Sequence, residues 1–138
     1  MTERKTVPIV LCSDGGADRS GQAAGACLLQ TADGATAGLI VYLGEATNNE
    51  AEICAGLLGF SWLCACHAAA PLGKVRWICD SEYVLKSATA YIRNWEKNGW
   101  KTADKKPVKN QGLWRAFLRL SAGCEIDPKH VRGHTGHA

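Results

Sequence analysis

The spacing of apolar residues changes near residue 47, and this change constrains the fold more than any other feature of the sequence. Before it, three segments have the composition of β-strands and are joined by short glycine-containing connections, which predicts an antiparallel meander. After it, apolar residues recur every three or four positions, which predicts a long helix. The expected strands are residues 7–12, 25–31 and 37–43, and the expected helix is 48–69.

The long helix should begin at a capping box, because Thr47 precedes Glu50 by three positions. Pro71 and Gly73 end it, and the apolar residues 75–79 follow as a fourth strand. A strand, a helix and another strand in this order are typical of the α/β class. The remaining expected elements are a helix over 81–90, an irregular stretch beyond Tyr91, a helix over 111–124 and a fifth strand over 126–132.

Length and cysteine content narrow the class of protein. A chain of 138 residues suits a single domain covering 1–138. No apolar run approaches the roughly 20 residues needed to span a bilayer, and no signal-peptide pattern follows the N-terminal residues. We therefore expect a cytoplasmic protein that does not bind a membrane. Its seven cysteines include no CxxC pair, which favours reduced core thiols over disulfides or a zinc site.

The formal net charge is only +3, but the basic residues are concentrated. Between Arg93 and Arg119 there are eight basic and two acidic residues, whereas the rest of the chain has more acidic than basic residues. A basic segment on a mildly acidic body indicates a polyanionic partner that is bound at one place.

Three carboxylates occupy places where a buried element begins or ends. Asp14 follows the first expected strand, Glu52 lies early in the long helix, and Asp80 ends the fourth strand. If the first and fourth strands are neighbours, all three side chains meet at one end of the sheet. A divalent cation would relieve their repulsion, and oxygen ligands favour magnesium or manganese. The alternative is that Asp14 and Asp80 form turns or helix caps.

Five motifs occur in order along nearly the whole chain and together resemble type 1 ribonuclease H of the bacterial kind. The fragment over 94–110 is the most specific of them. The motifs are SDGG (13–16), TNNEAE (47–52), CDSEYV (79–84), NWEKNGWKTADKKPVKN (94–110) and VRGHTGH (131–137).

The resemblance implies a ribonuclease H-like fold, a mixed five-stranded sheet flanked by helices. It also implies endonucleolytic cleavage of the RNA strand of an RNA/DNA hybrid, leaving 5′-phosphate and 3′-hydroxyl ends. We expect the protein to be a monomer. Two Mg²⁺ ions, with Mn²⁺ as a substitute, would be bound by four carboxylates. By the resemblance Asp14, Glu52 and Asp80 are the first three, and Glu50 aligns with a non-catalytic position.

The fourth carboxylate of the family would fall at position 144, beyond Ala138. Either the chain is truncated, or the protein works with three carboxylates and a substitute ligand. We expect truncation, with loss of the family's terminal helix, because the sequence ends inside the last motif. Without that carboxylate, an alternative function is a hybrid-binding module with weak or no nuclease activity. A third alternative, an integrase-like or Holliday-junction enzyme, is disfavoured by the fragment over 94–110.

The resemblance also assigns substrate contacts. His134 aligns with a mobile catalytic histidine that assists the leaving group or product release, whereas His67, His130 and His137 are interpreted as structural. An alternative interpretation of Trp95 and Trp100 is that they only anchor the basic segment by packing beneath it. The implied contacts are Gly15, Asn48, Asn49 and Glu82 near the RNA minor groove, Thr47 and Asn110 at a DNA phosphate, Tyr91 and Trp95 along a channel for the DNA sugar, and Lys97, Lys101, Lys105 and Lys106 in a basic handle.

Overall fold

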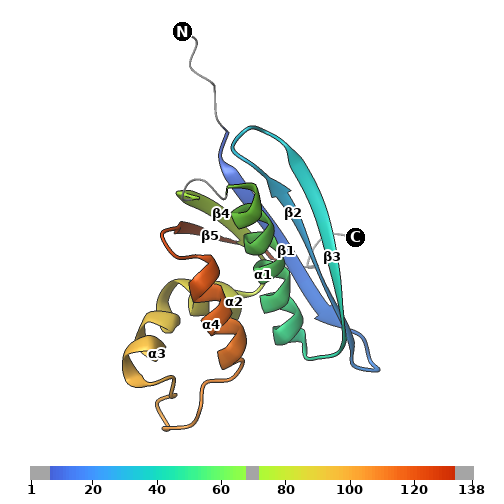
Figure 1. Cartoon of the computed structure of the whole chain (residues 1–138). Coiled ribbons are helices and arrows are strands. Elements are labelled where there is room, and N and C mark those ends of the chain that lie inside the picture. The colour runs from blue at the N-terminus through green and yellow to red at the C-terminus, as the bar shows by residue number, and fades with distance from the viewer. Residues whose placement is uncertain (1–6, 68–71, 133–138) are drawn as a thin grey trace.

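The computed structural model describes residues 7–67 and 72–132 (Figure 1). Its sheet has five strands in the order β3-β2-β1-β4-β5. The strands are β1 (Ile9–Ala17), β2 (Gln22–Gln30), β3 (Thr36–Glu45), β4 (Lys74–Cys79) and β5 (Glu125–His130). The helices are α1 (Asn48–Cys66), α2 (Glu82–Lys86), α3 (Ile92–Asn98) and α4 (Gln111–Leu120), with a π-helical segment, η1 (Ser87–Tyr91), between α2 and α3.

The sheet is mixed, as expected. β1, β2 and β3 form an antiparallel meander, whereas β4 is parallel to both β1 and β5. The helix α1 makes the crossover from β3 to β4, which explains why β4 can run parallel to β1. This arrangement confirms the predicted α/β class and the five-stranded mixed sheet.

The first strand is longer than predicted. We expected the strand to end at Cys12 and a glycine-containing connection to follow, but Asp14, Gly15 and Gly16 continue β1, and Gly15 pairs with Gly25 of β2. The turn comes later, where the Asp18 carboxylate accepts hydrogen bonds from the N–H groups of Ser20 and Gln22. The prediction failed because local glycine content favours a turn, whereas here the small residues serve close packing between β1 and a helix.

The sheet packs against α1 through small residues on the helix. A Cβ on Gly56 would lie 2.4 Å from the Trp77 indole, and one on Gly59 would lie 2.3 Å from the Leu11 side chain. Figure 1 shows α1 across one face of the sheet with α4 beside it. The aromatic rings of Phe60, Trp77 and Phe117 meet between these layers with centroids 5.3–5.6 Å apart. This core fixes the position of α1 on the sheet.

The helical region after β4 is also longer than predicted. Residues 82–98 run through α2, η1 and α3 with helical backbone at each junction, and Gly99 ends the run at φ 80°. Tyr91 is therefore inside a helical run rather than at its end. In contrast, α4 ends at Leu120, earlier than expected, and its buried side chains are Trp114 and Phe117.

The face of the sheet opposite α1 carries exposed apolar side chains. Alternation along β2 places Cys27 and Leu29 toward α1 and Leu28 on the other face, where Leu28, Ile40 and Tyr42 are 65–83% exposed. Among the helices of the described residues, none is long and apolar enough to cross a membrane.

Candidate active site

The fold brings three carboxylates from separate elements to one end of the parallel strands. Ser13 of β1 pairs with Cys79 of β4, so the next residues, Asp14 and Asp80, emerge side by side. Glu52, in the second turn of α1, completes the group. Asp14, Glu52 and Asp80 each offer one oxygen atom, and these atoms lie within 4.8 Å of one another.

The closeness of β1 and α1 depends on Gly15. A Cβ on Gly15 would lie 2.3 Å from the carbonyl carbon of Ala51, so only glycine allows this approach. The Gly15 N–H donates to Glu52 Oε1 at 3.2 Å. One turn earlier on α1, Asn48 Oδ1 accepts a hydrogen bond of 2.7 Å from the Ala17 N–H. Two side chains of α1 are thus hydrogen-bonded to the end of β1.

Glu52 has the most perturbed environment of the three acids. Its side chain is buried, at 8% exposure. Burial and the neighbouring Asp80 raise the pKa of Glu52 from 4.5 to about 8, while the Gly15 N–H opposes the rise and Asp14 adds to it. Within the described residues, Glu52 Oε2 is buried and has no hydrogen-bond partner. This oxygen needs a cation or a proton to be satisfied.

The group therefore fits a hard divalent cation. All donors are carboxylate oxygens, which Mg²⁺ and Mn²⁺ prefer. Asp14 is exposed and Asp80 half-buried, so the cluster opens to solvent on the side away from Glu52. A phosphate group could approach from that side.

The N-terminus of α1 forms the predicted capping box. Thr47 Oγ1 accepts from the Glu50 N–H, and Glu50 Oε1 accepts from the Thr47 N–H, both at 3.0 Å. This cap explains the position of Glu50 outside the carboxylate cluster. Thr47, Asn48 and Asn49 are all exposed around this helix end.

An aromatic hollow lies on α3. The rings of Tyr91 and Trp95 are 6.1 Å apart and tilted, and Trp95 also lies 6.3 Å from Trp100. The open hollow has a volume of about 620 Å³ and is also lined by Lys97 and Lys101. Trp100 is buried and anchors the following loop, whereas Trp95 is only half-buried and is both an anchor and part of the hollow's wall.

The lysine-rich segment that follows is an ordered hairpin. The Val108 N–H donates to the Trp100 carbonyl at 3.0 Å, and Lys101 forms an isolated bridge with Pro107. The Arg115 guanidinium lies 4.8 Å from the Trp100 ring centre, a cation–π contact on the anchor.

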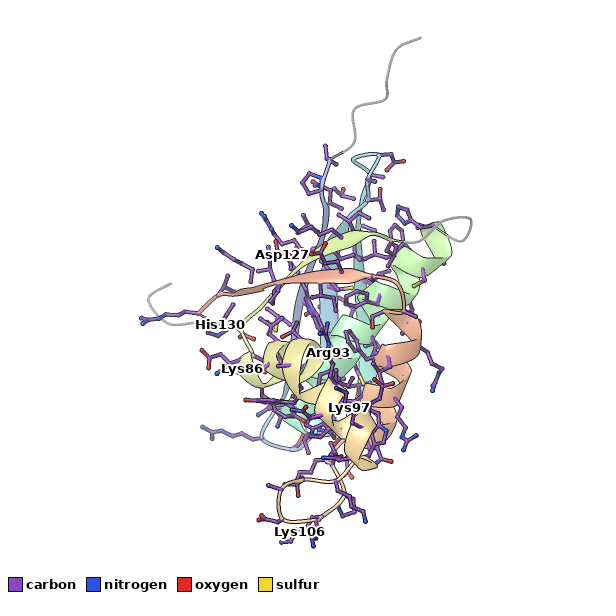
Figure 2. All side chains as sticks on the ribbon, turned by 90° about the vertical axis from the view of Figure 1, so that its left-hand side faces the viewer. Lys86, Arg93, Lys97, Lys106, Asp127 and His130 are labelled. Carbon is purple, nitrogen blue, oxygen red and sulfur yellow. The ribbon has the colours of Figure 1, made fainter. Side chains whose placement is uncertain are left out.

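The basic side chains of this hairpin point outward. Lys101, Lys105 and Lys106 are exposed, as is Lys97 in the last turn of α3. Figure 2 shows Lys106 at the outer tip of the loop. At the base of the hairpin, Asn110 adopts φ 61° and its Nδ2 lies 3.4 Å from the Tyr83 hydroxyl. We name residues 99–110 the basic hairpin.

The structure places His130 but does not describe the predicted catalytic His134. His134 and its neighbours lie outside the described residues. His130, which we interpreted as structural, lies beside the cluster, and its Nε2 is 3.0 Å from the Asp80 carbonyl oxygen. Glu82 of α2 lies beside this histidine: its Oε1 is 3.8 Å from His130 Nδ1, and its Oε2 is 3.6 Å from Lys86 Nζ. No local motif marks His130, because its position depends on the pairing of β5 with β4.

The mixed sheet, the crossover helix and the carboxylates at the end of the parallel strands define a nuclease of the ribonuclease H-like class. The RNase H family model matches residues 7–138. Ribonuclease HI of Pseudomonas aeruginosa is 38% identical over 122 residues, which is 81% of this chain and 78% of that protein. The chain belongs to the RNase H family and is a hydrolase, which confirms the resemblance to the type 1 enzymes.

Solved structures agree on the fold. LC9-RNase H1, described as a type 1 RNase H with the type 2 active-site motif, superposes with a TM-score of 0.77 at 23% identity, over 99% of this chain and 68% of that one. LC11-RNase H1 in complex with an RNA/DNA hybrid superposes with a TM-score of 0.69 at 19% identity, over 91% of this chain and 86% of that one.

Proposed function

We propose that this protein is an endonuclease that cleaves the RNA strand of RNA/DNA hybrids with two Mg²⁺ ions, leaving 5′-phosphate and 3′-hydroxyl ends. The observation that carries the proposal is the meeting of Asp14, Glu52 and Asp80 within 4.8 Å in a chain of the RNase H family. A structural relative has been solved with an RNA/DNA hybrid, which supports the choice of substrate.

Asp14, Glu52 and Asp80 are the residues that would hold the cations, with Mn²⁺ as a substitute. When bound, a pair of such ions would lower the pKa of a water molecule and would neutralise the charge on the attacking and leaving oxygens of an in-line displacement at phosphorus. Glu52 must lose its proton to act as a ligand, and its raised pKa couples cation binding to proton release. Gly15 keeps the Glu52 carboxylate oriented through its N–H.

The RNA strand would lie along the end of α1. The side-chain oxygen Oδ1 of Asn48 accepts from the Ala17 N–H, but the side-chain NH₂ remains a donor for a 2′-hydroxyl. Asn49, Gly15 and Glu82 border the same groove in this proposal. Selection of RNA at the scissile strand follows from donors that need the 2′-hydroxyl as their acceptor.

The DNA strand would lie over α3 and the basic hairpin. Thr47 Oγ1 already accepts the cap hydrogen bond, so its O–H is left to donate to a phosphate, with Asn110 opposite. Tyr91 and Trp95 form a channel wall that favours a sugar without a 2′-hydroxyl. Lys97, Lys101, Lys105 and Lys106 neutralise phosphates farther along the strand. His134 would assist departure of the leaving group or of the product.

The test is cleavage of an end-labelled RNA/DNA hybrid in Mg²⁺, with DNA duplex and RNA duplex of the same sequence as controls. We expect ladders of RNA fragments from the hybrid only, and loss of cleavage in Asp80→Asn. Glu45→Gln removes a comparable charge at an exposed position at the end of β3 and should leave the rate unchanged. Cleavage of the DNA duplex at a similar rate would refute the proposal, and hybrid binding without cleavage would make the chain a binding module.

A further inference from the structure

The backbone carbonyl of Asp80 is contacted by a side chain at the end of the sheet. The last residue pair between β4 and β5 is Cys79 with His130, and the Val131 N–H donates to the Cys79 carbonyl at 3.1 Å. The next carbonyl, that of Asp80, lies beyond this ladder. Its oxygen is 3.0 Å from Nε2 of His130. Figure 2 shows His130 at the end of β5. The imidazole thus contacts the first carbonyl after the last residue pair of β4 and β5.

The hydrogen-bonding partners define the tautomer. A backbone carbonyl can only accept a hydrogen bond, so Nε2 of His130 carries the proton and donates. The other contacts of this segment are weaker, because the Ser81 N–H donates to the Cys79 sulfur at 3.3 Å and sulfur is a poor acceptor. The hydrogen bond that His130 donates to the Asp80 carbonyl is therefore stronger than the one that the Ser81 N–H donates to Cys79.

We propose that His130 is a positioning residue for Asp80. By fixing the plane of the peptide group after Asp80, the imidazole sets the direction of the Asp80 side chain toward Asp14 and Glu52. This inference rests on the proposed function, because it concerns the cation site formed by these carboxylates. Cation sites require ligands held within about 0.5 Å and 10–20° of the binding geometry, so rotation of this peptide group weakens binding.

The size of the effect follows from the loss of one neutral hydrogen bond. Such a bond contributes a factor of roughly three to ten in an equilibrium constant. We therefore expect the dissociation constant for Mn²⁺ to rise by that factor when the donor is removed, while kcat at saturating Mg²⁺ changes less than about twofold, because the carboxylate itself is retained.

Two variants isolate the donor. His130→Gln retains an N–H group at a similar distance from the backbone, whereas His130→Met has similar length and no donor. His67 supplies the matched control, since its Nδ1 lies 3.0 Å from the Leu63 carbonyl at the far end of α1, about 22 Å along the helix from Glu52. His67→Met removes an equivalent contact without touching the cluster.

The measurement is calorimetric titration of the free protein with Mn²⁺ at one fixed pH, together with hydrogen exchange of the Ser81 amide and kcat at saturating Mg²⁺. We expect weaker binding and faster exchange in His130→Met, values near the parent in His130→Gln, and no change in His67→Met. Equal Mn²⁺ affinities of His130→Met and the parent would overturn the inference, as would equal losses in His130→Gln and His130→Met.

The outcomes for the two proposals are separable. A parent protein that binds Mn²⁺ but leaves the hybrid intact refutes the proposed nuclease and still allows the binding comparison. A parent protein that cuts the hybrid and whose Mn²⁺ affinity is indifferent to His130→Met refutes only the positioning role. A parent that binds no cation overturns both proposals.

Discussion

The burial of Glu52 among like charges predicts that removing its charge stabilises the metal-free protein at high pH. The folded-state pKa is about 8 and the ordinary value is 4.5. Below pH 4.5 the carboxyl is protonated in both the folded and the unfolded state. As the pH rises toward 8 the unfolded state releases this proton first, so the free energy of unfolding falls across that interval.

The width of this pH interval sets how far the free energy of unfolding falls. At about 1.4 kcal/mol for each pH unit, 4.5 to about 8 corresponds to an upper limit of about 5 kcal/mol, and water penetration and relaxation reduce it to about 2–4 kcal/mol. In Glu52→Gln the penalty is absent, and the amide oxygen can still accept from the Gly15 N–H. We expect the free energy of unfolding of the variant to exceed that of the parent by about 2–4 kcal/mol at pH 9. Near pH 4 the two free energies should differ by less than about 1 kcal/mol.

The assay is urea unfolding with a chelator present, at a series of pH values between 4 and 9, with Glu45→Gln as an exposed control. Adding Mg²⁺ should narrow this difference at high pH by about 2.7 kcal/mol at a hundred times its dissociation constant, because the cation stabilises the folded parent. At a thousand times the dissociation constant the gain is about 4.1 kcal/mol, which should reverse the order. A stability difference between Glu52→Gln and the parent that does not depend on pH would refute the reasoning, since it would mean that the carboxylate is not desolvated beside Asp14 and Asp80.

Asp14→Asn should abolish cleavage, leave hybrid affinity nearly unchanged and leave the metal-free melting temperature equal to or above that of the parent; a marked fall in that temperature would make Asp14 a structural cap. Gly15→Ala forces a Cβ against the Ala51 carbonyl, so it should lower the free energy of unfolding in urea by about 1–3 kcal/mol and abolish cleavage. Gly16→Ala should be tolerated, because its Cβ would lie 3.8 Å from its nearest neighbour. Equal losses in the two variants would contradict the close approach of β1 and α1. Replacing Lys105 and Lys106 by alanine should reduce the slope of log affinity against log salt for the hybrid by about one to two, and an unchanged slope would remove these lysines from the phosphate contacts.

Local sequence was sufficient where neighbours in the chain decide the structure. Thr47 and Glu50 are three residues apart, and their capping box forms as expected because both hydrogen bonds are made within one helical turn. The order of strands and helices, and therefore the α/β class, follows from apolar spacing for the same reason. The motif over 94–110 was sufficient to recognise the family. It did not indicate that Tyr91, which precedes it, lies inside a helical run.

Local sequence misled where distant packing decides. Asp14, Gly15 and Gly16 have the composition of a turn, yet they are strand residues because β2 pairs with them and α1 presses against Gly15. The contact with Ala51 is 36 residues away in the chain, so no window of ordinary length contains it. Glycine at this position serves close approach instead of a change of chain direction.

By itself, then, the sequence determined the family, the class of fold and which acids are candidates for the site. Only the tertiary structure decided that Ser13 pairs with Cys79, that Asp14, Glu52 and Asp80 meet within 4.8 Å, and that His130 lies against the Asp80 backbone. The physical reason is that strand register and desolvation arise from contacts between elements far apart in the chain. Residue type determines which chemistry a carboxylate or an imidazole is capable of. Its pKa and its hydrogen-bond partners depend on burial and on neighbouring groups, which exist only after the elements have packed together.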